Sequence, residues 1–389
     1  MRDSIRITPI GKKNQDGWTN LEWQIQTPQR EAQILRYSLP EEMGHLFCDP
    51  EQCDAPIATS LHLAMELGLN VLVDGKVCPD LLDGLEQLQQ IWGRWFPAKC
   101  KPVKISAREE ISHKAADDNL SAVFAFSGGV DGAYSLFHHL LDDGFRNRKK
   151  PQAALLIQGF DVPLDKEDIF QGAAQLARQQ LADTHVPLLQ MKTNSRTISQ
   201  DWHKSHGLQI AACFLTLQGQ YSHALLGSTE PYEKLMMPWG STPLTDPLSS
   251  SRAMSIHHDG CEVDRTQKIE WLATHTNACE SLRVCWEGAR KDRNCGKCEK
   301  CTRTMLNFWA AKRGLPKVFP THVTPKKIRT IKLRSQLQVN EIASILEHGL
   351  RRYGRNDPIV KALEIRLGQR GIKGVIRRAA NFARQAIQS

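Results

Sequence analysis

The first residues with the types and spacing for chemistry are Ser127-Gly128-Gly129-Val130-Asp131-Gly132. Apolar residues before them are typical of a buried strand, and an amphipathic helical pattern follows. Glycines let a backbone turn sharply and approach a ligand. The free N–H groups and positive dipole at a helix start attract phosphate, and Asp131 could hold Mg²⁺. The stretch therefore predicts a phosphate site, although Ser-Gly-Gly also occurs in plain tight turns.

Four cysteines form the second group. Cys285, Cys295, Cys298 and Cys301 are separated by nine, two and two residues. Thiolates at this spacing can close a tetrahedral Zn²⁺ site, and Gly296 lets the loop turn so that backbone N–H groups face the sulfurs. Four protein ligands leave no open position, so we expect a structural zinc. Free thiols and an iron–sulfur cluster are the alternatives.

The elements that must position these groups alternate between strand and helix patterns. Strands are expected at 121–126, 153–158, 186–191 and 222–227, and helices at 132–143, about 166–183, about 207–219 and about 264–274. This alternation predicts an α/β fold with a parallel sheet and helices on both faces. Ligands bind beyond the carboxyl ends of such strands.

The strand ends carry further candidate residues. Gln158 and Gly159 follow the second strand, and Ser228 and Glu230 follow the fourth. Because parallel strands end at one edge, we expect these residues to converge with the glycine turn, the first pair near a base or ribose and the second near an acyl group or metal. Each is, taken alone, also an ordinary turn residue.

Residues 229–260 show no clear periodicity. Loops this long within a compact domain are functional or disordered, and the aromatic content here argues against disorder. We expect a loop that covers the substrate, with Asp246 and Arg252 as catalytic contacts.

Two flanking segments complete the expected organisation. Residues 1–115 read as a small α+β domain with a polar turn from Gly11 to Gly17 and a linker at 111–120, residues 116–320 as the central domain, and residues 321–389 as a basic helical extension that includes a helix from Ile372 to Ile387. Packing or partner recognition is the expected role of the first segment.

The basic charge is concentrated in the last segment. Residues 321–389 hold 15 of the 51 Lys and Arg residues and 4 of the 42 Asp and Glu residues, a net charge of +11, which leaves −2 for residues 1–320. The extension could be a packed helical unit with a solvated face or contact an acidic partner or nucleic acid. Sparse aromatic residues make single-strand binding less favoured.

Composition excludes several classes of protein. No apolar run reaches the roughly 20 residues of a membrane helix, and the first residues lack a signal-peptide core. The odd number of cysteines, 11, disfavours a disulfide framework. We therefore expect a cytoplasmic protein without membrane contact.

The run Ser127–Asp131 resembles the signature of the PP-loop ATP pyrophosphatases, which adenylate a substrate with ATP and release pyrophosphate. Together with Leu282-Arg-Val-Cys-Trp286 and the three later cysteines, it resembles 7-cyano-7-deazaguanine synthase over residues 120–320. The resemblance implies a Rossmann-like PP-loop (HUP) fold. It also implies ATP and Mg²⁺ at Ser127, Gly128, Gly129 and Asp131, and zinc at the four cysteines.

The same resemblance implies a reaction. The family adenylates 7-carboxy-7-deazaguanine, ammonia attacks to give an amide, and a second ATP drives dehydration to the nitrile. The segments on both sides of the central domain are additions to the family pattern. They suggest a specialised paralogue of the kind found in anti-phage defence operons, which could join the acid to a protein amine instead of ammonia.

One departure lies in the turn itself. Gly132 stands where the family has a serine, and Ser135 could supply the missing hydroxyl. On this basis, replacing Gly132 with serine is expected to preserve or raise ATP use. The rival functions are a tRNA thiolation enzyme, which would need Cys261 or Cys279 as a catalytic thiol, and a non-catalytic nucleotide-binding adaptor, which Gly132 favours.

Overall fold

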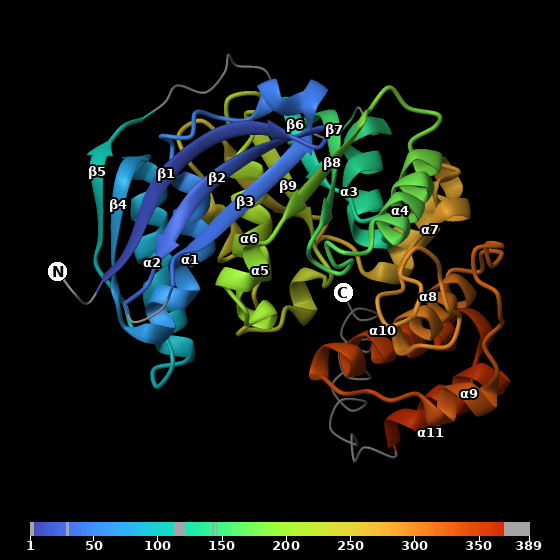
Figure 1. Cartoon of the computed structure of the whole chain (residues 1–389). Helices are drawn as coiled ribbons and strands as arrows, with labels where there is room; N and C mark the ends of the chain where they lie inside the picture. The colour runs from blue at the N-terminus through green and yellow to red at the C-terminus, as the bar shows by residue number, and fades with distance from the viewer. Residues whose placement is uncertain (1–3, 29–30, 113–120, 142–143, 145, 369–389) are drawn as a thin grey trace.

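The computed structural model describes residues 4–28, 31–112, 121–141, 144 and 146–368. Its backbone is one ten-stranded sheet in the order β10-β9-β6-β7-β8-β3-β2-β1-β4-β5 (Figure 1). The strands are β1 Ser4–Gln15, β2 Trp18–Gln26, β3 Gln33–Pro40, β4 Asn70–Val77, β5 Ile105–Glu110, β6 Ser121–Ala125, β7 Lys150–Gln158, β8 Leu188–Thr193, β9 His223–Gly227 and β10 Ser255–Asp259. The fold is thus mixed α/β.

Helices connect and cover this sheet. The α-helices are α1 Asp54–Leu67, α2 Pro79–Trp95, α3 Val130–Leu141, α4 Glu167–Gln180, α5 Ser195–Ile198, α6 Trp202–Leu215, α7 Arg265–His275, α8 Glu299–Ala310, α9 Pro325–Thr330, α10 Gln336–Tyr353 and α11 Pro358–Gly368. Within the described ranges, none of them has both the length and the apolar character that crossing a bilayer requires.

Strands β10, β9, β6, β7 and β8 are parallel, as the alternation of patterns predicted. Alternate residues along them point to opposite faces of the sheet. Val123 and Leu155 pack into a core with α1, α2 and α6. Phe124 and Leu156 pack on the other side with α3, α4 and α7. Helices therefore cover both faces of the parallel half. Because β6, β7 and β9 are parallel, their carboxyl ends lie at one edge of the sheet.

The first hundred residues share this sheet and its core. Strand β3 pairs antiparallel with β8 through Tyr37–Thr193 and Ser38–Lys192, and one hydrophobic core contains residues from Ile5 to Ile256. The expected α+β elements are present, but they extend the central sheet and are not a separate sheet with a core of their own. Most of the expected linker, residues 113–120, lies outside the described residues.

Three local expectations differ from the structure. Strand β1 continues through Gly11 to Gln15, and the turn is at Asp16 and Gly17, both with positive φ. Strands β3 and β10 were not expected. In β3, Leu35, Tyr37 and Leu39 do alternate inward. Strand β10 is a short, mostly polar segment whose conformation is decided by its pairing with β9.

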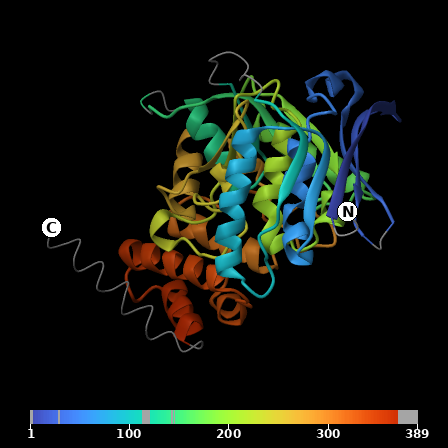
Figure 2. The same ribbon diagram turned by 90° about the vertical axis from the view of Figure 1, so that its left-hand side faces the viewer.

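The C-terminal extension is helical, as expected, over α9, α10 and α11. These helices form a third hydrophobic core with Leu306 and Ala310 of α8. Both ribbon views place them at one end of the molecule, away from the N-terminal strands (Figures 1 and 2). The expected helix from Ile372 to Ile387 lies outside the described residues.

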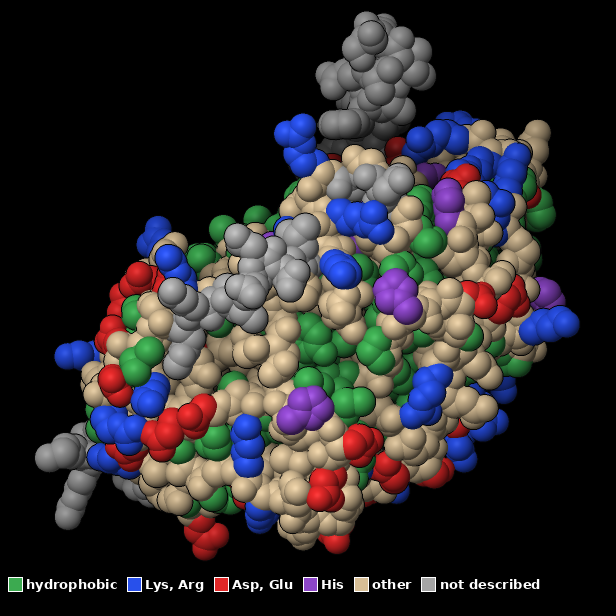
Figure 3. Space-filling view, turned by 90° about the horizontal axis from the view of Figure 1, so that it is seen from above, with side chains coloured by type: hydrophobic (Ala, Val, Ile, Leu, Met, Phe, Trp, Pro, Cys, Tyr) green, Lys and Arg blue, Asp and Glu red, His purple; other side chains and the backbone are tan. Residues whose placement is uncertain are grey.

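Charges of both signs share the surface. On the face seen from above, Lys and Arg side chains alternate with acidic and uncharged ones over most of the area and gather toward one corner (Figure 3). A basic stripe would be the electrostatic footprint of nucleic acid binding, and this face carries mixed charges instead.

Candidate functional site

The glycine turn joins β6 to α3 at the carboxyl edge of the parallel strands. Gly128 has a φ of +78°, a conformation that favours glycine. Its carbonyl oxygen accepts hydrogen bonds from the Arg283 backbone N–H at 2.8 Å and the Gln180 Nε2 at 2.9 Å. The Arg283 side chain also donates to the Ser127 carbonyl at 3.2 Å. The carbonyls of the turn are thus held by neighbouring segments, while the first N–H groups of α3 lack acceptors within the helix.

Gly132 is required by close packing. A Cβ atom here would lie 2.6 Å from the backbone oxygen of Ala125, and one at Gly227 would lie 2.5 Å from the backbone oxygen of Asp131. Helix α3 therefore packs directly on β6 and β9. A serine at this position would force α3 away from the strands, which argues against the expectation that Gly132→Ser preserves or raises ATP use.

Ser135 does not supply the missing hydroxyl. Its side chain is buried and donates a hydrogen bond to Asp259 Oδ2 at 2.5 Å, at the end of β10. His139 also contacts Asp259, with 3.2 Å between Nε2 and Oδ1. Ser135 thus belongs to a polar cluster that fastens α3 to β10.

Asp131 is held by positive charges. Arg265 forms two hydrogen bonds with its carboxylate, and Lys268 Nζ lies 3.8 Å from Asp131 Oδ1. Burial alone would raise the pKa of Asp131, but the Arg265 and Lys268 charges outweigh it and hold this pKa below its usual value. Asp131 is therefore ionised and already has cationic partners.

Two further cations come from the first turn of α8. The charge of Lys300 helps to lower the pKa of both Asp131 and Asp161, so its ammonium group acts on both carboxylates. Of the residues that the structure describes, no carboxylate lies within ion-pair distance of Lys300. Arg303 is buried and pairs with Glu299 at 2.7 Å and with Glu341 of α10. A cluster of cations thus surrounds the start of α3.

Helix α10 closes this cluster from outside the sheet. Glu341 accepts two hydrogen bonds of 3.1 Å from Arg265 Nη1. Asp264, the N-cap of α7, accepts from Ser344 at 2.7 Å and lies 2.6 Å from His348 Nε2. Burial would raise the pKa of Asp264, but the bond and charge of His348 hold it well below its usual range. The expected C-terminal extension is therefore part of the site's wall.

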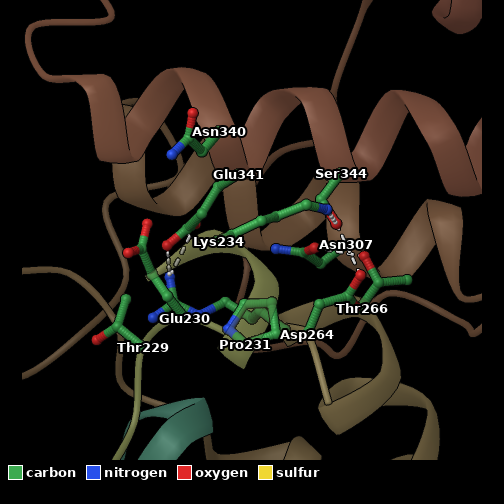
Figure 4. A pocket seen from close by; sticks show the side chains of 11 residues that line it. Thr229, Glu230, Pro231, Lys234, Asp264, Thr266, Asn307, Asn340, Glu341 and Ser344 are labelled. Atoms are coloured by element: carbon green, nitrogen blue, oxygen red, sulfur yellow. Dashed lines mark hydrogen bonds and ion pairs between the residues drawn. The ribbon is translucent and has the colours of Figure 1, made fainter. Parts of the chain in front are cut away.

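A pocket lies between the end of β9, the start of α7 and α10. Glu230, Lys234, Asn307 and Ser344 line it, together with Arg265, which also contacts Asp131 (Figure 4). Side chains leave about 310 Å³ between them, open solvent included. Arg265 thus connects the pocket to the glycine turn.

The strand-end predictions have mixed outcomes. Glu230 is buried and lines the pocket. Ser228 is also buried, but its Oγ donates to the Glu230 carbonyl at 2.7 Å and shapes the turn. Gln158 donates to the carbonyls of Pro163 and Leu164 within its own turn. Gly159 allows close packing, since a Cβ would lie 1.9 Å from the Thr193 carbonyl oxygen.

Asp246 and Arg252 do not join the glycine turn. Asp246 begins the short helix η3 (Asp246–Ser249) and is buried, with hydrogen bonds from Ser241 at 2.6 Å and His258 at 2.8 Å. Arg252 is 67% exposed and lies 3.7 Å from Asp80. The loop is packed against the N-terminal half, because Leu248 lies against Gly84 of α2. In this structure Asp246 anchors the loop, and the Arg252 side chain lies at the surface.

The four cysteines meet as predicted. The Sγ atoms of Cys285, Cys295, Cys298 and Cys301 lie within 4.8 Å of one another. The N–H of Cys298 donates to Cys295 Sγ at 3.2 Å, and Gly296 between them has a φ of +65°. The site is compatible with zinc, since four thiols with N–H support form a closed tetrahedral set. Cys298 is also the N-cap of α8.

The cations that surround the glycine turn were not predicted from the sequence. Arg265 and Lys268 start α7, which begins with a capping box formed by Asp264 and Gln267. Lys300 and Arg303 each lie two positions after a cysteine, Cys298 and Cys301 respectively. The helix-start signal and the cysteine motif were both readable, but neither indicates where its helix docks.

One family model matches a segment that contains part of this site. A model described as a family of unknown function (DUF6395) matches residues 266–377, a segment that holds the four cysteines, Lys268, Lys300 and Glu341 but not the glycine turn. No curated protein and no solved structure matches the chain.

Proposed function

We propose that this chain is an ATP-dependent adenylating ligase with a Rossmann-like PP-loop site, similar to 7-cyano-7-deazaguanine synthase. It adenylates a deazapurine-type carboxylate and releases pyrophosphate. An amine, either ammonia or a protein amine, then displaces AMP. The observation that carries the proposal is the ring of cations, Arg265, Lys268 and Lys300, around the helix start that follows Ser127–Gly132.

The residues act by electrostatic stabilisation. The N–H groups at the start of α3 point toward an anion. Arg265, Lys268 and Lys300 offset the charge that develops on the departing pyrophosphate. The carboxylate of the substrate is itself the nucleophile toward the α-phosphate, so the step needs no general base.

Magnesium does not fit Asp131 as the protein is folded here. Both carboxylate oxygens of Asp131 face Arg265 or Lys268. A magnesium ligand needs a carboxylate that is free to face the ion. We therefore assign the neutralisation of phosphate charge to the cations and derive no step through Mg²⁺.

Zinc fits the cysteine cluster. Cys285, Cys295, Cys298 and Cys301 would hold it, and when bound it would cross-link the loop before α8. Asn294 holds the two ends of this loop together. Its Oδ1 accepts a hydrogen bond from the Val284 N–H at 2.9 Å, and its Nδ2 donates one to the Leu282 carbonyl at 2.8 Å. The cluster holds the first turn of α8, and with it Lys300.

The thiolation alternative needs a reactive thiol near the turn. Burial raises the pKa of Cys279 to about 12, and Cys261 is buried with its thiol donating to Ser228 Oγ at 3.2 Å. Buried thiols of this kind are inert. The adaptor alternative is favoured by the Asp131–Arg265 pair, which occupies the expected metal ligand.

The test is pyrophosphate release. The full chain is incubated with ATP and 7-carboxy-7-deazaguanine, with and without ammonium, and pyrophosphate and AMP are measured. Release that depends on the acid supports adenylation. ATP binding without release, for this acid and for other purine-like acids, would favour the adaptor.

A further inference from the structure

The pocket beside the glycine turn contains an acceptor that no group of the protein uses. Glu230 is 7% exposed. Its Oε2 accepts a hydrogen bond from the Met236 N–H at 2.9 Å, while its Oε1 is buried and lacks a donor among the described residues. Burial raises the pKa of Glu230 to about 7, against the effects of the Met236 N–H, Arg265, Arg303 and Lys234. A buried acceptor without a donor is costly, so a ligand that carries N–H groups would relieve this cost.

Several other polar groups of the pocket already have partners. Lys234 donates to Ser344 at 3.0 Å, and Thr266 donates to Asn307 at 2.7 Å. Asp264 is occupied by Ser344 and His348, and Glu341 by Arg265. Glu230 and Glu341 lie near each other at one end of the pocket, with Thr266 and Asn307 at the other (Figure 4). The two carboxylates give that end acceptor character.

The size of the space limits the ligand. Between its side chains the pocket has room for about one molecule of the size of water or ammonia. Its position suits an acceptor substrate, because Ser228–Glu230 follow β9, which lies next to β6, and Lys268 bonds to the Ser228 carbonyl while facing Asp131. A nucleophile at Glu230 would stand beside the phosphate site.

We propose that Glu230 binds the amine nucleophile of the reaction, and that this nucleophile is ammonium or an amine of similar size and not a lysine of a partner protein. The inference rests on the proposed function, whose acceptor it specifies. Charged groups from every neighbouring element face Glu230: Lys234 before β10, Arg265 of α7, Arg303 of α8 and Glu341 of α10.

In the amide-forming step, the nitrogen of ammonium replaces AMP on the acyl carbon. Ammonium transfers one proton to the Glu230 carboxylate, and the nitrogen lone pair forms a bond to the acyl carbon. The bond between that carbon and the AMP oxygen breaks, and its electron pair stays on AMP. The new nitrogen loses a second proton to solvent, which leaves a neutral amide.

The first test is binding, without any reaction. The melting temperature of the full chain is measured in ammonium chloride, potassium chloride and tetramethylammonium chloride at equal ionic strength. Ammonium is expected to raise it above both other salts, because a ligand of the folded state stabilises that state. An equal effect of ammonium and tetramethylammonium would overturn the site.

The second test is the ammonium dependence of amide formation. Glu230→Gln is expected to reduce amide formation at low ammonium on the order of 100-fold, the range typical of a lost proton acceptor, and to abolish the ammonium effect on melting. Glu233→Gln is the matched control, since this exposed residue is three positions away. N-acetyl-lysine methylamide is the alternative acceptor.

The outcomes separate the two proposals. An unchanged ammonium dependence in Glu230→Gln, or a lysine analogue that reacts as well as ammonium, overturns the amine site while adenylation stands. Ammonium binding that Glu230→Gln abolishes, without pyrophosphate release from any acid, refutes adenylation and leaves the amine site in place.

Discussion

Lys300 is the residue on which the proposed phosphate chemistry depends most directly. It lies near Asp131 and Asp161, but among the described residues no carboxylate is within ion-pair distance of its ammonium group. Its charge is therefore available to a ligand. Lys300→Met is expected to weaken ATP binding at least tenfold, because it removes a positive charge from the phosphate site. A tenfold loss corresponds to about 1.4 kcal/mol of binding free energy. Equilibrium binding of ATP checks this.

Lys297→Met is the matched control for Lys300. Lys297 is exposed in the same cysteine loop, so this variant removes the same charge from the same loop. Equal losses of ATP binding in the two variants would show that general charge, and not this site, attracts the nucleotide.

Gly132 gives a prediction about stability. Gly132→Ser places a Cβ 2.6 Å from the Ala125 oxygen, and overpacking of this kind costs about 1–3 kcal/mol. We expect a lower melting temperature and weaker ATP binding. Gly219→Ser is the control, since nothing lies within 4 Å of its Cβ position. A fully stable Gly132→Ser protein would contradict the close packing of α3.

His258 makes stability depend on pH. Burial would lower its pKa, but the bond to Asp246 raises it from 6.5 to about 9. The folded state therefore binds this proton more tightly, so the stabilisation is complete below about pH 6.5 and is lost as pH rises through about 9. Urea unfolding at pH 6.5 and 9 should show the loss, and His258→Gln should flatten it. His203→Gln, at an exposed site, should keep the wild-type slope.

At the scale of elements, the cysteine loop and α8 act as one unit. Cys298 caps α8, and the same turn carries Lys300 toward the glycine turn. Removing a metal from the four cysteines is therefore expected to weaken ATP binding, although the cysteines are not part of the proposed phosphate site.

Metal analysis and nucleotide binding test this coupling. The full chain should contain about one zinc per chain, Cys298→Ser should lose it together with ATP affinity, and Cys100→Ser should keep both. A visible absorption band would indicate an iron–sulfur cluster instead.

Prediction from the sequence succeeded where one element carries its own signal. Strands β6, β7, β8 and β9 and helices α3, α4, α6 and α7 followed from periodicity, whereas β10 did not, and the four cysteines followed from spacing. The way in which distant helices pack against one another could not be predicted from such local patterns. Glu341 reaches Arg265 from 76 residues away in the chain, and no local pattern specifies that contact. Strand β3 was missed although Leu35, Tyr37 and Leu39 alternate inward and its neighbour β2 pairs with it along its length. Its second pairing, with β8, joins segments that are distant in the chain and follows from no local pattern.

For the whole molecule, the shared core predicts that the N-terminal part cannot be removed. Ile7 and Trp23 lie in the same core as Leu155 and Ile256. A chain that starts at residue 113 would expose that face of β6, β7 and β8, so we expect it to be insoluble or unfolded. A truncated protein with a cooperative thermal transition would show that residues 1–112 are an independent unit.

The pairing of β3 with β8 also has a consequence for synthesis on the ribosome. The core around Tyr37 is completed only when Ile256 has left the exit tunnel. At about 5–20 residues per second, the roughly 150 residues between β3 and β8 take about 8–30 s to make. During that interval β3 is an unpaired strand edge on a nascent chain, a surface that favours chaperone capture or association between neighbouring polysomes.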